Sequence, residues 1–142
     1  MSQQMRYIFC SASRLGRTFL FLYKGDVMKV AIVGSRNIFI ENFDRYLTKD
    51  VTEIVSGGAK GVDFCAKKYA QTHNISYKEF LPDYKKYGKA APLYRNNEII
   101  AYSDKVLAFW DRTSKGTKYV IQKCQKQNKP LEIYLSGEDY FD

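Results

Sequence analysis

The sequence is poor in the residues that build metal centres and disulfide frameworks. Its 142 residues include one histidine, His73, and three cysteines, Cys10, Cys65 and Cys124. The cysteines are widely spaced and form no CxxC pair, which disfavours a zinc site and a disulfide scaffold. Cysteines of this kind fit a reducing compartment, so we expect a cytoplasmic protein without a metal or another cofactor.

The single histidine also limits hydrolytic chemistry. A Ser-His-Asp or Cys-His arrangement would have to use His73. His73 stands near the end of an expected helix, where a cation complements the helix dipole. We therefore expect His73 to have a structural role.

Long hydrophobic runs and low-complexity tracts are missing as well. No stretch approaches the roughly 20 apolar residues that a membrane span needs, so we expect no membrane partner. Hydrophobic residues make up 45% of the chain and charged residues 27%, which is typical of a globular protein. A chain of this length predicts one domain whose core needs no disulfide or metal.

Positive charge is in excess. The formal net charge is +8, a value often associated with nucleic-acid binding. Residues 1–27 contribute +3 and residues 28–142 contribute +5. A charge of +5 suits a nucleotide pocket as well as a DNA groove, so charge leaves both open.

Residues 1–27 show neither clean alternation nor a helical stripe. Arg14 and Arg17 interrupt the apolar stretch, which argues against a secretory signal. Residues 24–26 can be encoded by AAA-GGA-GAT, which contains a bacterial ribosome-binding sequence, ahead of the Met28 codon. We therefore expect a bacterial or phage protein that starts at Met28, with an upstream mis-start or tag before it. A transit peptide and an ordered arm that uses "TFLFLY" are the alternatives.

From Met28 onward, apolar runs alternate with amphipathic segments. The runs predict strands at residues 29–34, 51–56, 76–81, 105–110 and 131–135. The amphipathic segments predict helices at residues 39–50, 62–74, 92–102 and 115–128. With right-handed crossovers, this order predicts the α/β class: a Rossmann-like three-layer sandwich with a five-stranded parallel sheet. We expect a single domain over residues 28–142, with a solvated tail from residue 136.

Four loops follow the first four expected strands. They read "GSRN", "SGGAKG", "PDYKKYGKAA" and "DRTSKGT", and the last three place a glycine directly beside a lysine. In such folds ligands bind at the carboxyl ends of the strands. Amide groups at helix starts attract anions, glycine lets backbone approach closely, and lysine and arginine add charge-assisted hydrogen bonds. These loops predict a phosphate site.

The candidate site residues follow from these loops. They are Gly34, Ser35, Arg36, Ser56, Gly57, Gly58, Lys60, Gly61, Asp63, Arg95, Asn96, Asp111, Ser114, Lys115, Gly116 and Thr117. Arg95 is the strongest single candidate, since a guanidinium binds phosphate in a bidentate manner. Asp63 is as consistent with capping a helix as with binding a ribose.

Other residues keep alternative interpretations. Lys60 is a phosphate ligand or an exposed lysine, Asn96 binds ligand or pins a loop, and Asp111 binds a ribose or ends a strand. Three aromatic residues are base-stacking candidates: Tyr84, Tyr87 and Tyr94. Glu98 is the nearest candidate general base, but no catalytic residue is identified, so we lean towards a binding protein.

The loops match neither of the common phosphate-binding motifs. "GSRNIF" lacks the GxGxxG of dinucleotide-binding folds, and "GGAKGVD" lacks the GK[ST] ending of a P-loop. A hydride-transfer enzyme and a P-loop NTPase are therefore disfavoured.

The motifs "VAIVGSRN", "IVSGGAKGVDFCAKKYA", "PDYKKYGKAAPLYRNNEII", "SDKVLAFWD" and "TSKGT" together resemble the SLOG superfamily. They are most similar to its YspA-type (YpsA-related) branch. The resemblance implies a Rossmann-like core and a pocket for a nucleotide or a nucleotide-derived ligand such as an ADP-ribose-like molecule. It also implies a sensor or a processing site, with no reaction established for most members. Whether the chain forms a homo-oligomer is left open by the sequence.

Two related families supply alternatives. The Lonely Guy phosphoribohydrolases use a glutamate that would align with Val120, so this resemblance disfavours their activity although Arg95 matches their arginine. The DNA-processing protein A family shares "GSR", "SGGAxGxD" and "RNxII" and binds single-stranded DNA. We therefore expect a nucleotide-derived ligand, with single-stranded DNA as the alternative partner.

Overall fold

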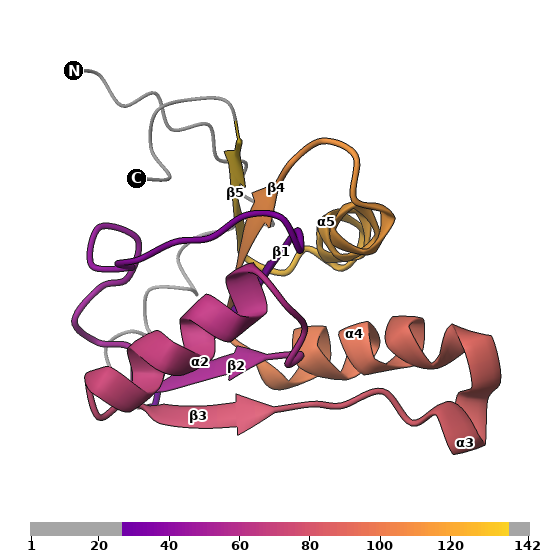
Figure 1. The fold of residues 1–142 in the computed structure, drawn as a ribbon, viewed down its shortest axis with the longest axis horizontal. Helices are drawn as coiled ribbons and strands as arrows, with labels where there is room; N and C mark the ends of the chain where they lie inside the picture. The colour runs from indigo at the N-terminus through magenta and orange to yellow at the C-terminus, as the bar shows by residue number, and fades with distance from the viewer. Residues whose placement is uncertain (1–26, 137–142) are drawn as a thin grey trace.

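The computed structural model describes residues 27–136 and contains one sheet of five parallel strands (Figure 1). The expected extension and tail lie outside the described residues, apart from Val27 and Ser136. The strands are β1 (Lys29–Gly34), β2 (Glu53–Ser56), β3 (Ser76–Glu79), β4 (Lys105–Trp110) and β5 (Leu131–Leu135). Their order is β3-β2-β1-β4-β5, which confirms the predicted fold class.

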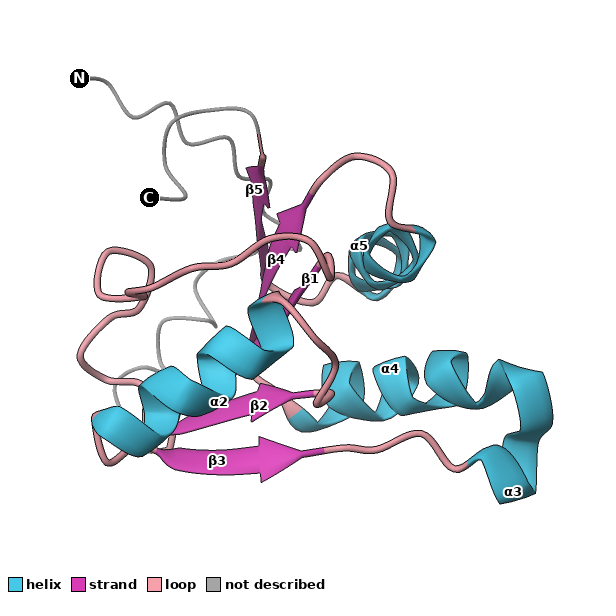
Figure 2. Cartoon of the chain, in the orientation of Figure 1, coloured by secondary structure: helices cyan, strands magenta, loops and turns pink. Residues whose placement is uncertain are grey.

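Helices cover both faces of the sheet (Figure 2). They are α2 (Val62–Thr72), α3 (Tyr84–Tyr87), the short 3₁₀ helix η1 (Gly88–Ala90), α4 (Ala91–Tyr102) and α5 (Lys115–Gln127). Three of the four expected helices thus form close to their predicted bounds. Pro92 lies in the first turn of α4, where its missing N–H costs no hydrogen bond.

The strands are apolar on both sides because each face is buried under a layer. In β1, Val30 and Ile32 join α2 and residues 38–46 in one core cluster, while Ala31 and Val33 join α4 and α5 in the other. Successive side chains of a strand point to opposite faces, so a continuous apolar run feeds both cores. This explains why the strands could be predicted from short apolar runs.

The expected helix at residues 39–50 is wrong. Ile38 and Ile40 are buried while Phe39 between them is exposed, which is the alternation of an extended chain. Two separate turns form further on: the amides of Tyr46 and Leu47 both donate to the carbonyl of Phe43, and the amide of Val51 donates to the carbonyl of Thr48.

Local polar side chains explain why a helix does not form there. The amide of Asp44 donates to Asn42 Oδ1 at 2.7 Å, and the Thr48 hydroxyl donates to Asp50. Such short-range bonds give the backbone an alternative to the helix. Buried rings then anchor the segment, with Phe43 and Tyr46 packing edge-on against Phe109.

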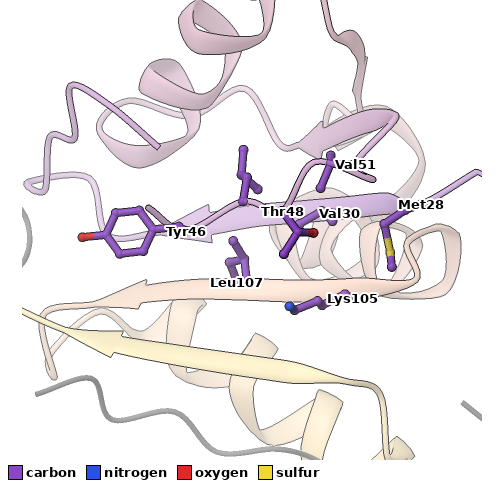
Figure 3. A pocket seen from close by; sticks show the side chains of 8 residues that line it. Met28, Val30, Tyr46, Thr48, Val51, Lys105 and Leu107 are labelled. Carbon is purple, nitrogen blue, oxygen red and sulfur yellow. The ribbon is translucent and has the colours of Figure 1, made fainter. Parts of the chain in front are cut away.

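A small cavity lies beneath this irregular segment (Figure 3). Its volume is about 20 Å³, and Tyr46, Thr48 and Val51 border it together with residues of β1 and β4. That volume is about the space of one water molecule, so we treat it as a packing gap.

The close contact at Gly34 generates a stability prediction. A Cβ at Gly34 would lie 2.5 Å from Val62 Cγ2 and 2.7 Å from the Phe109 carbonyl oxygen. We expect Gly34→Ala to lower the free energy of unfolding by about 1–3 kcal/mol or more, measured by urea titration, because a packed core cannot absorb the added methyl. Gly116→Ala is the matched control, because nothing lies within 4 Å of its Cβ position. Equal effects of the two substitutions would contradict this account.

Candidate functional site

The carboxyl ends of β1, β2 and β4 bring three of the predicted loops to one edge of the sheet. The strand order reverses between β1 and β4, so this edge is the topological switch point. Ser35 links the two strands: its amide donates to the Phe109 carbonyl at 3.0 Å, and its Oγ accepts the Asp111 amide at 3.1 Å. The predicted clustering of these loops is therefore observed, whereas ligand binding stays a prediction.

Residues 57–61 form what we call the glycine loop, and its three glycines approach their neighbours too closely for side chains. Gly61 has φ +75°, and a Cβ there would lie 2.5 Å from the Arg36 carbonyl oxygen. Gly58 also has φ +75°, and its Cβ would lie 2.8 Å from Glu79 Oε2. Both residues need the left-handed conformation and the empty space that glycine supplies.

Asp63 holds the glycine loop from the side of α2. Its side chain is buried, with 6% of the residue exposed. Oδ2 accepts the amide of Gly57 at 3.2 Å and the amide of Ala59 at 3.3 Å. Of the two interpretations of Asp63, the structure displays the carboxylate that binds backbone amides.

Arg95 holds the same loop from the side of α4. Its Nη1 donates to the Gly57 carbonyl at 2.6 Å and to the Phe80 carbonyl at 3.4 Å, while Nε donates to Asn96 Oδ1 at 2.9 Å. A Cβ at Gly57 would lie 2.5 Å from that Nη1 and 3.1 Å from Asp63 Oδ2. We call Asp63, Gly57 and Arg95 the clamp. Sequence reasoning found all three residues but not their mutual contacts.

Burial of the side chain has the largest effect on the pKa of Asp63. It raises the pKa of the carboxyl group to about 6, against the opposing effects of the Ala59 amide, the Arg95 guanidinium and the Gly57 amide. The folded state therefore holds a proton on Asp63 in a pH range where the unfolded chain has lost it.

The loop after β4 is organised by a second carboxylate. Asp111 Oδ1 accepts the amides of Thr113 at 2.9 Å and Ser114 at 2.8 Å. Desolvation raises the pKa of Asp111, but these amide bonds outweigh it and the pKa falls to about 2. Ser114 caps α5, since its Oγ accepts the Thr117 amide at 3.3 Å.

Several amides at this edge have no acceptor among residues 27–136. They belong to Gly58, Lys60, Gly61 and Val62 in and after the glycine loop, and to Lys115 and Gly116 at the start of α5. Arg36 and Lys60 are exposed beside them. The edge thus presents amide donors and cations together.

The three candidate stacking tyrosines are grouped on α3 and α4. The rings of Tyr87 and Tyr94 stack on each other, with centroids 3.9 Å apart and planes at 13°. Tyr84 is 60% exposed. Figure 1 shows α3 at the far end of α4, beyond the ends of β2 and β3.

A cleft of about 350 Å³ borders the glycine loop and was not predicted from the sequence. It is lined by Gly58, Ala59, Asp63, Phe64, Lys67, Lys68, Gln71 and Glu79. The signal was present in the sequence, because positions 64, 67, 68 and 71 share one face of α2, away from its buried Ala66 and Ala70. An aromatic residue on that otherwise polar face marks the cleft.

Two further residues were considered from the sequence, Val120 and Glu98. Val120, at the position of the Lonely Guy glutamate, is a residue of α5 and is buried in the core. Glu98 lies exposed on α4.

Within residues 27–136, no cluster of three or more histidine, cysteine, aspartate or glutamate side chains could hold a metal ion. No helix in the described part of the chain is long and apolar enough to cross a membrane.

The raised pKa of Asp63 gives a pH prediction. Between about pH 4 and pH 6 the folded state binds more protons than the unfolded state, so the contribution of Asp63 to stability falls as pH rises. The free energy of unfolding of the wild type minus that of Asp63→Asn should fall by up to about 3 kcal/mol across this range. Urea titrations at several pH values measure it. A difference that is flat or rises with pH would contradict the assignment.

Comparison with known proteins gives one family match. Residues 16–82 match the family described as DNA recombination-mediator protein A. No curated protein and no solved structure matches the chain. The matched stretch includes β1, the glycine loop, α2 and β3, so the chain is similar to this family over the first half of the candidate site, and the finer resemblance to the YspA-type branch stays a prediction.

Proposed function

We propose that the carboxyl edge of the sheet binds the phosphate of a nucleotide-derived ligand. The observation that carries this proposal is the glycine loop, which leads into α2 with the amides of Gly58, Lys60, Gly61 and Val62 unpaired among the described residues. Amides at a helix start, with the helix dipole behind them, favour an anion. The exposed cations Arg36 and Lys60 add charge of the required sign.

The clamp supports this role by fixing the loop before a ligand arrives. Asp63 takes the amides of Gly57 and Ala59, and Arg95 takes the carbonyl of Gly57. The guanidinium also offsets the negative charge that Asp63 would otherwise set against a phosphate. In this proposal Arg95 positions the loop and does not contact the phosphate.

The size of the adjoining cleft supports a ligand larger than inorganic phosphate. A volume of about 350 Å³ lies in the range of small-molecule sites. A nucleoside monophosphate or an ADP-ribose-like molecule fits this description. The proposed activity is binding.

Single-stranded DNA is the second candidate, and the family match favours it. The segment from α3 to the start of α4 adds an exposed Tyr84 beside Lys85, Lys86 and Lys89. Aromatic rings among lysines are typical of single-strand binding surfaces.

The nucleotide proposal predicts a loss of affinity when the cations of the edge are removed. Arg36→Ala and Lys60→Ala should each weaken AMP or ADP-ribose binding by about threefold to tenfold, since each removes an exposed charge beside the phosphate. Isothermal titration calorimetry measures the effect. Lys49→Ala is the control, because Lys49 is an exposed lysine in the turn that precedes β2. Equal affinity of all variants, or no binding by the wild type, would refute the proposal.

The DNA candidate predicts a different signature. Fluorescence anisotropy with a labelled oligothymidylate of about 15 nucleotides should show affinity that falls steeply between roughly 50 and 200 mM salt. Tyr84→Ala should weaken this binding by about fivefold or more if its ring stacks on a base. If the protein does not bind the oligothymidylate at low salt, the DNA proposal is wrong. If Tyr84→Ala binds it as tightly as the wild type, the surface around Tyr84 is not the DNA-binding surface.

A further inference from the structure

The cleft on the outer face of α2 suggests which part of the ligand lies beside the phosphate. We propose that this cleft holds the ligand's base, stacked on Phe64, and that Glu79 selects a base with an exocyclic amino group. The inference rests on the proposed phosphate site, because the two are continuous: Gly58 and Ala59 of the glycine loop also line the cleft.

Phe64 is the aromatic ring that borders the cleft. It lies in the first turn of α2, one residue after Asp63, and is 56% exposed. Its neighbours Val62 and Ala66 are fully buried, so the outward position of Phe64 follows from the helix period. A flat apolar ring exposed beside a phosphate loop offers a stacking surface for a base.

The candidate tyrosines are placed less well for this task. Tyr87 and Tyr94 already cover one face of each other, and neither lines the cleft. Leu81 is 63% exposed and approaches the glycine loop, with its Cδ2 3.2 Å from the Cβ position of Gly58. Apolar surface therefore flanks Gly58 from both α2 and the chain after β3.

Glu79 supplies the polar selectivity. It ends β3, its side chain is 26% exposed, and its Oε1 lies 3.3 Å from the ammonium of Lys67. That ion pair orients the carboxylate toward α2. A carboxylate accepts hydrogen bonds and donates none, so it binds an amino group and repels a carbonyl at the same position.

Lys68 provides a further cation at the cleft. Its side chain is exposed, and among residues 27–136 it has no carboxylate partner. An amino-bearing base attached to a phosphorylated sugar matches this combination of ring, acceptor and cation. Among common nucleotides this favours AMP over inosine monophosphate.

Phe64→Ala tests the stacking contact. By calorimetry, wild-type protein should bind AMP at least about tenfold more tightly than ribose 5-phosphate. Phe64→Ala should weaken AMP binding by about fivefold or more and leave the affinity for ribose 5-phosphate unchanged. Phe39→Ala is the matched control, since Phe39 is 64% exposed in the segment between β1 and β2 and does not line the cleft. Both rings are exposed, and circular dichroism checks that both variants fold.

Glu79→Gln tests the selection. The wild type should prefer AMP to inosine monophosphate by about tenfold, and the variant should show less than about a twofold preference, because a glutamine amide can also donate to the carbonyl.

The outcomes separate the two proposals. No binding of ribose 5-phosphate or AMP to the wild type would overturn the phosphate site and the base site together. Binding of ribose 5-phosphate with AMP no tighter, or AMP binding unaffected by Phe64→Ala, would overturn the base site alone. Binding of oligothymidylate without AMP binding would also overturn it, because thymine lacks the amino group.

Discussion

The site depends on the position of one residue, Gly57, and of the two peptide groups on either side of it. Its amide is held by Asp63, which α2 carries on one face of the sheet, and its carbonyl is held by Arg95, which α4 carries on the other face. The two covering layers therefore meet at the end of β2. Glycine suits this position because a Cβ would lie 2.5 Å from Arg95 Nη1 and 3.1 Å from Asp63 Oδ2, so the clamp would have to shift. The clamp therefore holds the glycine loop, whose glycines could adopt many backbone conformations, in one conformation.

The chain's own carboxylates shape what a ligand would encounter. Asp63 takes two amides of the glycine loop, and Asp111 takes two amides of the loop after β4. An anion at this edge would therefore bind the remaining donors and would not displace either side chain. Their environments differ: Asp63 is buried and harder to ionise, whereas Asp111 is held ionised by the bonds it accepts. The carboxylates of Asp63 and Asp111 thus fix the conformations of the glycine loop and of the loop after β4.

The sequence predicted the features that follow from local pattern. Apolar runs gave the strands, and strand–helix alternation gave the parallel sheet, because parallel strands need helical crossovers and buried faces. The convergence of the loops after β1, β2 and β4 followed from that topology. The helix predicted over residues 39–50 was wrong because a short-range hydrogen bond between Asn42 and Asp44 competes with the helical hydrogen bonds. The contacts of Arg95 join positions 38 residues apart, and the exposure of Phe64 depends on packing around α2, so neither could be predicted from spacing.

The close contacts at Gly34 and Gly61 bear on the kinetics of association. Gly34 lets α2 and β4 lie against the end of β1, and Gly61 lets the glycine loop lie against the Ser35 and Arg36 carbonyls. The start of α2 thus packs closely against the ends of β1 and β4, with the Val62 side chain directly against Gly34. Little conformational entropy remains to be lost when such a surface is occupied. For the ligand binding that we propose, the rate of association at this edge would then be set mainly by diffusion and by the field of its cations.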